Sequence, residues 1–174
     1  FGNVIAGVPF HFEDNMLPIY TGSFWALFNP FALVCGVVSL SLLIFHGANY
    51  LQLRTEGVIA ARARIASLVF GAILLIAFTL GGIFVAGMEG YVITSQVMPG
   101  EAASPLGKTV IRQMGSWLGN YQAHSLLWLV VALAYLGTVL ALLASAGRNG
   151  GVAFIGSALS CAGIILTAGT AIFP

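Results

Sequence analysis

The sequence predicts an all-α integral membrane protein, built as a bundle of four membrane-spanning helices. Only 6% of the 174 residues carry a charge, whereas about 25% do so in a soluble domain. In addition, 59% of the residues are hydrophobic, and they gather in four segments that each reach the roughly 20 residues a spanning helix needs. Because lipid offers a backbone no hydrogen-bond partners, each segment is expected to be a helix.

The apolar segments predict the boundaries of one membrane domain that covers residues 1–174. Its helices are expected over residues 24–51, 60–89, 124–146 and 150–173. The loops between them are expected over residues 52–64 and 90–123. The chain starts at Phe1 without a signal-peptide pattern, and its first residues resemble the end of an earlier helix. We therefore expect a fragment of a longer polypeptide.

The first helix has a recognisable start. Asn29 precedes Pro30, and proline is tolerated in the first turn of a helix, where the asparagine side chain is expected to satisfy free backbone donors. Small residues follow at Gly36, Ser39 and Ser41. Such residues allow a neighbouring helix to approach closely in lipid, so this face is expected to pack against another helix.

The second helix follows Arg62 and Arg64, and its apolar run begins at Ile65. Only the glycine-rich segment at residues 147–151 separates the third helix from the fourth. A tight turn of this kind predicts that these two helices are an antiparallel pair. The fourth helix carries small residues at close-approach spacing. They are Gly156, Ser160 and Gly163, with Ser157 and Cys161 on a second row.

The long loop between the second and third helices contains a turn signal at residues 98–100, Met-Pro-Gly. After this turn, Ser104 is expected to cap a short helix whose first position is Pro105. Apolar residues recur at helical spacing from Leu106 to Leu118. We expect this short helix to lie flat at the outer membrane interface.

Basic residues predict the orientation, because short cytoplasmic loops carry an excess of Lys and Arg. The loop over residues 52–64 and the turn after the third helix lie on one side of the membrane, and most acidic residues lie on the other side. The first side is therefore expected to face the cytoplasm. Its cations are Arg54, Arg62, Arg64 and Arg148. Orientation is a sufficient role for them; contact with a lipid phosphate or a partner subunit is the alternative.

Ionisable side chains inside a membrane are costly, so each one is a functional hypothesis. His46 lies on the first helix, and Asn49 and Tyr50 follow three and four residues later on the same face. We interpret His46 as either hydrogen-bonded within the bundle or extended toward the inner membrane surface, with a proton relay or a quinone contact as the alternative. Glu89 is interpreted as a solvated helix end, with proton exit as its alternative.

Binding of haem, metal or nucleic acid is not expected, and no catalytic arrangement is visible. His46 lies near the inner surface and His124 near the outer one, so they cannot share one iron, and His11 is expected to be solvated. Cys35 and Cys161 lie inside helices and are interpreted as small packing residues, too few for a metal site. A net charge of +1 implies no nucleic-acid partner.

Several short strings follow one another in an order more specific than the composition. They are Gly7-Val8-Pro9-Phe10, Asn29-Pro30-Phe31-Ala32-Leu33, His46-Gly47-Ala48-Asn49-Tyr50-Leu51-Gln52-Leu53-Arg54, Ser104-Pro105-Leu106-Gly107-Lys108 and Thr167-Ala168-Gly169-Thr170-Ala171-Ile172-Phe173-Pro174. Together they resemble subunit II of the bacterial cytochrome bd quinol oxidases, including the cyanide-insensitive branch. The resemblance spans the whole sequence and corresponds to the second half of that subunit.

The resemblance implies a terminal oxidase of the bacterial cytoplasmic (inner) membrane, which oxidises a quinol and reduces oxygen to water. Haem b and haem d would belong to the partner, subunit I, against which subunit II packs as a non-catalytic subunit. Subunit II can hold a structural quinone, for which His46 and Tyr50 are the candidates here, and can contribute proton access. The loop over residues 90–123 would then be periplasmic. Some family members have Gln at the position of His46, which argues against an essential imidazole.

Two other functions stay open from the residues alone: a helical membrane transporter, or an assembly subunit of another membrane complex. Paired helices with small residues suit a transporter as well. A transporter usually has broken helices and polar groups near the bilayer midplane, and the last three helices hold few such groups. These are Thr79, Thr138, Ser157, Ser160 and Thr167. Copurification of a cofactor would distinguish these classes.

Overall fold

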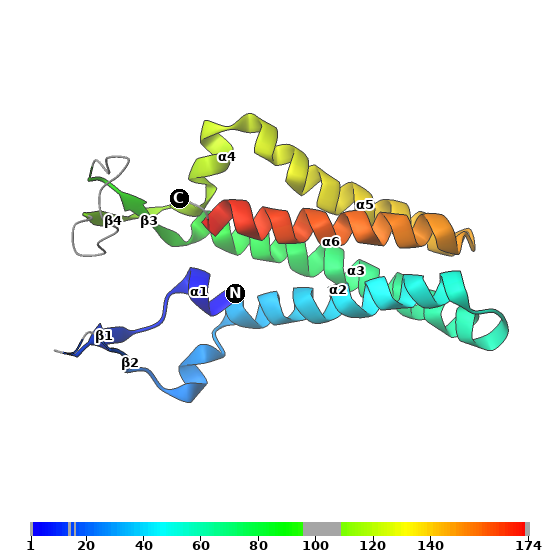
Figure 1. Cartoon of the computed structure of the whole chain (residues 1–174), viewed down its shortest axis with the longest axis horizontal. Helices are drawn as coiled ribbons and strands as arrows, with labels where there is room; N and C mark the ends of the chain where they lie inside the picture. Colours follow the sequence, from blue (N-terminus) through cyan, green and yellow to red (C-terminus); the bar gives the residue numbers. More distant parts are fainter. Residues whose placement is uncertain (1, 14, 16, 96–108, 173–174) are drawn as a thin grey trace.

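Four long helices form the body of the molecule and run along one another (Figure 1). The computed structural model of the chain describes residues 2–13, 15, 17–95 and 109–172. The long helices are α2 (Pro30–Arg54), α3 (Gly57–Gly87), α5 (Trp128–Ala146) and α6 (Gly150–Ile172). All four segments are long and apolar enough to cross a membrane, which confirms the predicted all-α membrane fold.

The four helices pack in a ring. α2 and α3 form one pair and α5 and α6 form a second, while α6 also packs against α2 and α3 against α5. Side chains from all four helices meet at the centre of this ring. The core residues are Leu42, Phe45, Leu74, Ala134, Ala141 and Ile164.

Helix α2 begins where the sequence predicts a helix start. The side chain of Asn29 accepts a hydrogen bond from the Ala32 amide at 2.8 Å, and Pro30 occupies the first helical position. Phe24–Leu27 form a separate 3-10 helix, η1. The single helix predicted over residues 24–51 is therefore two elements, because the proline removes a backbone donor and disfavours helix at the residue before it.

The loop predicted over residues 52–64 is almost entirely helical in the structure. α2 continues to Arg54 and α3 begins at Gly57, so only Thr55 and Glu56 lie between them. The predicted loop begins where charged residues interrupt the apolar pattern. Charge ends the contact of a helix with lipid but not the helix itself, since alanine and arginine are good helix formers.

Helices α5 and α6 form the predicted antiparallel pair. In the turn between them Arg148 has a φ of 61°, and Asn149 Oδ1 accepts a hydrogen bond from the Val152 amide at 3.2 Å. The predicted third helix is divided, since regular α-helix begins only at Trp128. Two short helical elements come before it, α4 (Gly119–Ala123) and η4 (Ser125–Leu127).

Two β-hairpins lie at the end of the bundle opposite the α2–α3 turn (Figure 1). β1 (Phe10–Phe12) pairs with β2 (Pro18–Tyr20), and β3 (Glu89–Ile93) pairs with β4 (Val110–Met114), both in antiparallel register. The short elements α1 (Gly2–Ala6) and η3 (Ser116–Leu118) lie beside them in the chain. These hairpins were not predicted.

The short helix predicted over residues 106–118 is wrong over residues 110–114, and of its described residues only Ser116–Leu118 at its end are helical, as η3. Val110–Met114 form strand β4, while residues 96–108, with the predicted turn and cap, lie outside the described residues. Val92 of β3 lies opposite Ile111 of β4, and such β-branched pairs stabilise a sheet. The prediction rested on the spacing of apolar residues within this one segment. Such a spacing contains no information about a partner strand elsewhere in the chain.

Candidate functional site at the arginine end of the bundle

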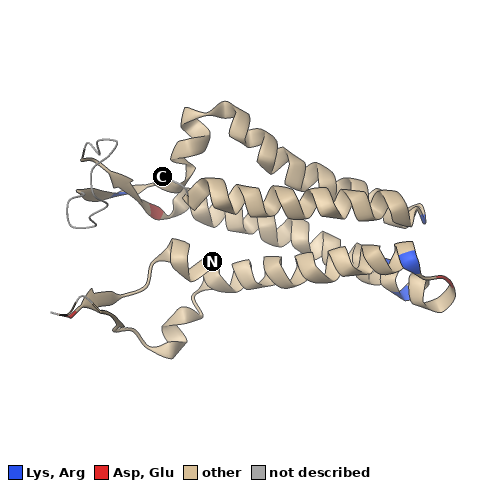
Figure 2. Cartoon of the chain, in the orientation of Figure 1, with Lys and Arg blue, Asp and Glu red and all other residues tan. Residues whose placement is uncertain are grey.

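The four arginines predicted to face the cytoplasm lie at one end of the bundle, called here the arginine end. Figure 2 shows cations at the α2–α3 turn and at the α5–α6 turn, with the hairpins at the opposite end. The four side chains are those of Arg54, Arg62, Arg64 and Arg148. The fold thus brings two distant turns to one surface, and the location of this surface in the cytoplasm stays a prediction.

His46 lies on α2 and faces α6. Its Nδ1 is 2.9 Å from Ser157 Oγ, and its ring stacks on Phe154 with 5.0 Å between the ring centroids. The Ser157 hydroxyl also donates to the Phe154 carbonyl oxygen at 2.9 Å. Because a hydroxyl has only one hydrogen, both contacts are satisfied together when the His46 Nδ1–H donates to Ser157. The neutral imidazole then presents an acceptor, Nε2, on its other edge.

Tyr50 lies about one turn beyond His46 and shares its aromatic neighbour. Its ring centroid is 5.8 Å from that of Phe154, and the guanidinium carbon of Arg54 is 6.0 Å from the Tyr50 ring centroid. Tyr50 is 47% exposed, and its hydroxyl makes no hydrogen bond within the described residues. The two candidate quinone contacts therefore form one aromatic group with Phe154.

Asn49 is fully buried and faces α3 rather than α6. Its Oδ1 accepts hydrogen bonds from Ser67 Oγ at 2.8 Å and from Gln52 Nε2 at 3.2 Å. Its Nδ2 donates to the Phe45 carbonyl oxygen at 2.9 Å. Gln52 Oε1 in turn accepts from Ser145 Oγ at 2.9 Å. We call Asn49, Gln52, Ser67 and Ser145 the amide network, and it joins α2, α3 and α5.

The amide network consists of neutral side chains that satisfy one another. Asn49, Ser67 and Ser145 have no exposed surface. Leaving such a buried group without a partner costs about 1–3 kcal/mol, and each of these three finds its partner on a neighbouring helix. The network can therefore fix the relative positions of three helices, but it offers no charge and no nucleophile with a base.

Helices α5 and α6 approach each other through small residues. The hydroxyls of Thr138 and Ser160 lie 2.6 Å apart and are buried. A Cβ added to Gly156 would lie only 2.7 Å from the Ala141 nitrogen. The small residues predicted for the fourth helix thus pack within this chain. By contrast, a Cβ added to Gly36 of α2 would meet no atom of the described chain within 4 Å.

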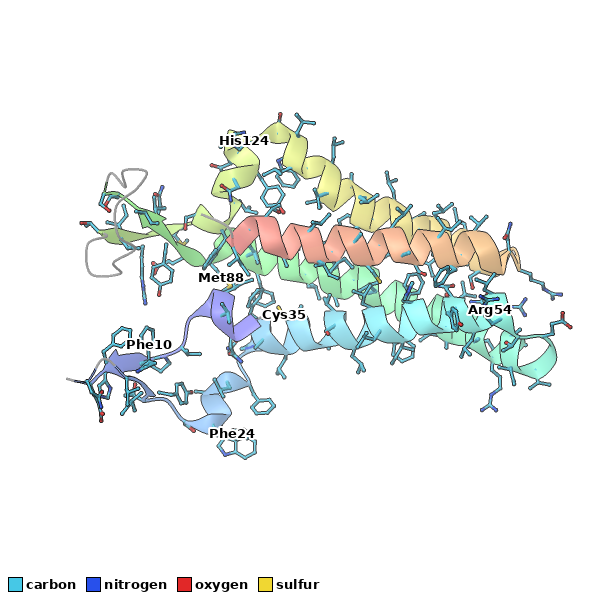
Figure 3. All side chains as sticks on the ribbon, in the orientation of Figure 1. Phe10, Phe24, Cys35, Arg54, Met88 and His124 are labelled. Atoms are coloured by element: carbon cyan, nitrogen blue, oxygen red, sulfur yellow. The ribbon has the colours of Figure 1, made fainter. Side chains whose placement is uncertain are left out.

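The remaining candidates lie at the opposite end of the bundle. His124 follows α4, far from Arg54 (Figure 3). Glu89 begins β3, and His11 lies in β1; all three are exposed. Glu89 is thus an exposed strand residue rather than the predicted end of a helix. The fold brings none of these side chains to His46.

The whole sequence matches a family model described as cytochrome bd terminal oxidase subunit II, over residues 1–174. The chain belongs to this family. It is 44% identical over 174 residues to the probable cytochrome oxidase subunit 2 of Haemophilus influenzae. It is 41% identical over 175 residues to the cytochrome bd-I ubiquinol oxidase subunit 2 of Escherichia coli K12. Both matches cover 100% of the chain and 46% of the relative, so the chain spans about half the length of these curated relatives.

Cytochrome bd oxidases carry haems in the subunit that partners subunit II. A haem held by this subunit II segment itself would need its histidines as ligands to the iron. His46 and His124 lie toward opposite ends and cannot ligate one iron. His46 Nδ1 is engaged by Ser157, and one face of its ring is covered by Phe154. Among the described residues, no three His, Cys, Asp or Glu side chains could hold a metal ion. That the segment binds neither haem nor metal stays a prediction.

Sequence reasoning found His46, Asn49 and Tyr50 but missed the partners that define their surroundings. Three of the missed residues belong to the amide network. They are Gln52, Ser67 and Ser145. Each lies within three residues of an arginine in the sequence. Their similar distance from an arginine places these polar residues at a similar depth in the membrane. This shared depth is the sequence feature that could have predicted their contact.

Proposed function

We propose that this subunit II segment is part of the non-catalytic membrane subunit of a complex that oxidises quinol and reduces oxygen. Membership of the subunit II family supports the assignment of the chain to such a complex. One observation carries the non-catalytic role: every buried polar side chain found among the described residues is neutral. They are Ser41, Asn49, Ser67, Thr138, Ser145, Ser157 and Ser160. A bundle with this interior is suited to holding helices in place rather than to moving electrons or protons.

The proposed partner is the haem-bearing subunit I. Only 17–33% of the most apolar part of each span is buried within the chain, so most of each helix surface faces lipid or another subunit. On α2 the open small-residue face at Gly36 allows close approach of a further helix. A second bundle packed here would keep water and lipid away from the haems of its neighbour.

A structural quinone is the second part of this proposal, and the structure favours Tyr50 over His46 as its contact. A quinone carbonyl oxygen accepts hydrogen bonds, and the Tyr50 hydroxyl is an exposed donor with no partner in the described chain. His46 with its proton on Nδ1, the arrangement that satisfies both contacts of Ser157, has no second N–H to offer a quinone. We assign His46 to bundle packing, and proton access would rest on parts of the subunit other than the amide network.

The location proposed is the bacterial cytoplasmic membrane, with the arginine end in the cytoplasm. Positive side chains concentrate on the cytoplasmic side of membrane proteins. The arginine end carries four arginines and one described carboxylate, Glu56. At the opposite end the described charges are Glu13, Glu89 and Arg112. The hairpins at that end would then face the periplasm.

A reduced-minus-oxidised absorption spectrum tests the proposed function. The full-length subunit that contains this sequence is purified from membranes through a tag, together with its native partners. Bands of haem b and haem d are expected in the preparation, with quinol-dependent oxygen uptake. The control is the same purification from cells that lack subunit I, where these bands should be absent. A haem-free preparation that keeps its native partners would contradict the oxidase role and favour a transporter or another assembly subunit.

A further inference from the structure

An open cavity of about 400 Å³ lies at the arginine end, between α2, α3 and the α5–α6 turn. Its lining combines two arginines, one amide side chain and small residues. The lining residues are Gln52, Gly57, Ala60, Ala61, Arg64, Arg148 and Gly150. The cavity is large enough for a phosphate group with its surrounding water.

The two arginines reach this cavity from separate parts of the fold. Arg64 is half-buried on α3, and Arg148 is exposed in the α5–α6 turn. Neither guanidinium group forms an ion pair or hydrogen bond with another described residue. None of the lining residues is a carboxylate, and Gln52 already uses its amide within the amide network. Two arginines therefore line one cavity to which the described chain contributes no carboxylate.

Two long helices also begin at the cavity. Gly57 is the first residue of α3 and Gly150 the first residue of α6. α3 has no side-chain cap at this end, so its first backbone N–H groups lack a side-chain acceptor. The N-terminal end of each of these helices carries a positive partial charge. A Cβ on Gly150 would lie 2.8 Å from the Gln52 carbonyl oxygen, so α6 begins in close contact with α2.

We propose that this cavity binds a phosphate-bearing anion. Arginine matches the geometry of phosphate oxygens by donating two parallel hydrogen bonds, and helix N-terminal N–H groups suit the same ligand. Basic pockets between helices on the cytoplasmic side of a membrane favour anionic head groups. The phosphate can come from an anionic lipid head group or from free phosphate in the cytoplasm. This inference does not depend on the proposed oxidase role, because it rests on the cavity alone.

Lipid binding to the complex that contains the full-length subunit tests the inference. The complex is delipidated in detergent, and native mass spectrometry then follows titration with phosphatidylglycerol, with phosphatidylcholine and with inorganic phosphate. The variants are R64Q, R148Q and the double variant. R54Q is the matched control, because it removes the same charge at the same end but Arg54 does not line the cavity.

Phosphatidylglycerol is expected to bind the wild type more tightly than phosphatidylcholine does. Loss of one arginine should weaken binding about fivefold and loss of both about 30-fold, while R54Q stays within about twofold of the wild type. Binding of inorganic phosphate with the same dependence on Arg64 and Arg148, without phosphatidylglycerol binding, would identify free phosphate as the source. Equal losses in R54Q, or unchanged binding in the double variant, would overturn the inference.

A measurement on the wild type covers the case in which the double variant fails to assemble. Phenylglyoxal modifies accessible arginines, and mass spectrometry of the digested protein reports each site. Phosphatidylglycerol, or inorganic phosphate in the second arm, is expected to protect Arg64 and Arg148 but not Arg54. Protection of neither cavity arginine by either ligand would contradict the proposal.

Discussion

At the level of single residues, several polar side chains inside the spans interact in pairs that join different helices. His46 meets Ser157 of α6, Asn49 meets Ser67 of α3, and Thr138 of α5 meets Ser160 of α6. Apart from His46, every side chain in these pairs is neutral. Hydrogen bonds of this kind contribute modestly to membrane-protein stability, on average about 0.6 kcal/mol, but they select one arrangement of the helices.

Replacing His46 with Gln in the full-length subunit is expected to change haem content and quinol-dependent oxygen uptake by less than about twofold, well under one factor of ten in rate. A glutamine amide can donate to Ser157 Oγ in place of the imidazole N–H. The measurement is the haem-to-protein ratio with oxygen uptake on the same sample. A large loss of uptake at unchanged haem content would show that the subunit needs a titratable group at this position.

Replacing Asn49 with Leu is expected to destabilise the subunit by about 1–2 kcal/mol, because Ser67 and Gln52 lose their shared acceptor inside the bundle. The measurement is the thermal inactivation midpoint of the purified complex. Ser39→Ala, on an exposed position of the same helix, should shift the midpoint little. Combining Asn49→Leu with Ser67→Ala should be less harmful than the sum of the two changes, and strict additivity would argue against the bond.

At the level of elements, the turns and the small-residue contacts determine which helices pair. Only two residues separate α2 from α3 and three separate α5 from α6, so each pair is held at the arginine end. Along α5 and α6 the backbones approach closely enough that a Cβ at Gly137 would lie 2.6 Å from the Ser160 nitrogen. In lipid the hydrophobic effect does not drive one helix against another. Close van der Waals packing of this kind supplies the attraction between the helices instead.

Replacing Ser160 with Leu is expected to push α5 away from α6, since the larger side chain has no room beside Gly137 and Thr138. Overpacking of this kind costs about 1–3 kcal/mol. Haem retention of the purified complex should fall if the pair supports subunit I. Ala158→Leu on the exposed face of α6 is the control and should retain haem. Unchanged haem content in Ser160→Leu would show that assembly of the complex does not depend on the contact between α5 and α6.

At the level of the whole molecule, the ring of helices has one end rich in arginine and another that carries the hairpins. The helices themselves present mainly apolar surface outward. This distribution fits a body that spans the bilayer with the arginine end on the cytoplasmic side. It also leaves large apolar faces for a partner subunit.

The orientation can be tested by cysteine labelling in the full-length subunit. Glu56→Cys lies in the α2–α3 turn, and Gln113→Cys lies in β4; both positions are exposed. A membrane-impermeant maleimide added to spheroplasts is expected to label Gln113→Cys but not Glu56→Cys, and inverted vesicles should give the reverse. The wild type, with Cys35 and Cys161 inside the spans, provides the background. Labelling of Glu56→Cys from outside would reverse the orientation.

The sequence was sufficient to predict features that depend on local composition. The four spans follow from long apolar runs, and the start of α2 follows from Asn29 and Pro30. The hairpins were missed because strand pairing joins residues that no local pattern relates, as for Val92 and Ile111. The loop over residues 52–64 was wrong because hydropathy reports where lipid ends rather than where a helix ends.

The candidate site shows the same division between local and distant information. An ionisable or amide side chain in an apolar run stands out by itself, so His46 and Asn49 were recognised. Their partners are small hydroxyl residues on other helices, such as Ser157, which is 111 residues from His46. Serine is common in membrane helices as a packing residue, so nothing in the sequence distinguished Ser157 as the partner of His46.

The length of α3 determines how the protein meets membranes of different thickness. Its 31 residues span about 46 Å at the rise of an α-helix, whereas the hydrocarbon layer is about 30 Å thick. The part after Arg64 accounts for about 34 Å of this length. The first turns, from Gly57 to Arg64, therefore project into the head-group layer as a stiff helical extension. Since no flexible loop can take up a change in acyl-chain length there, the helix must tilt or the bilayer must deform around it.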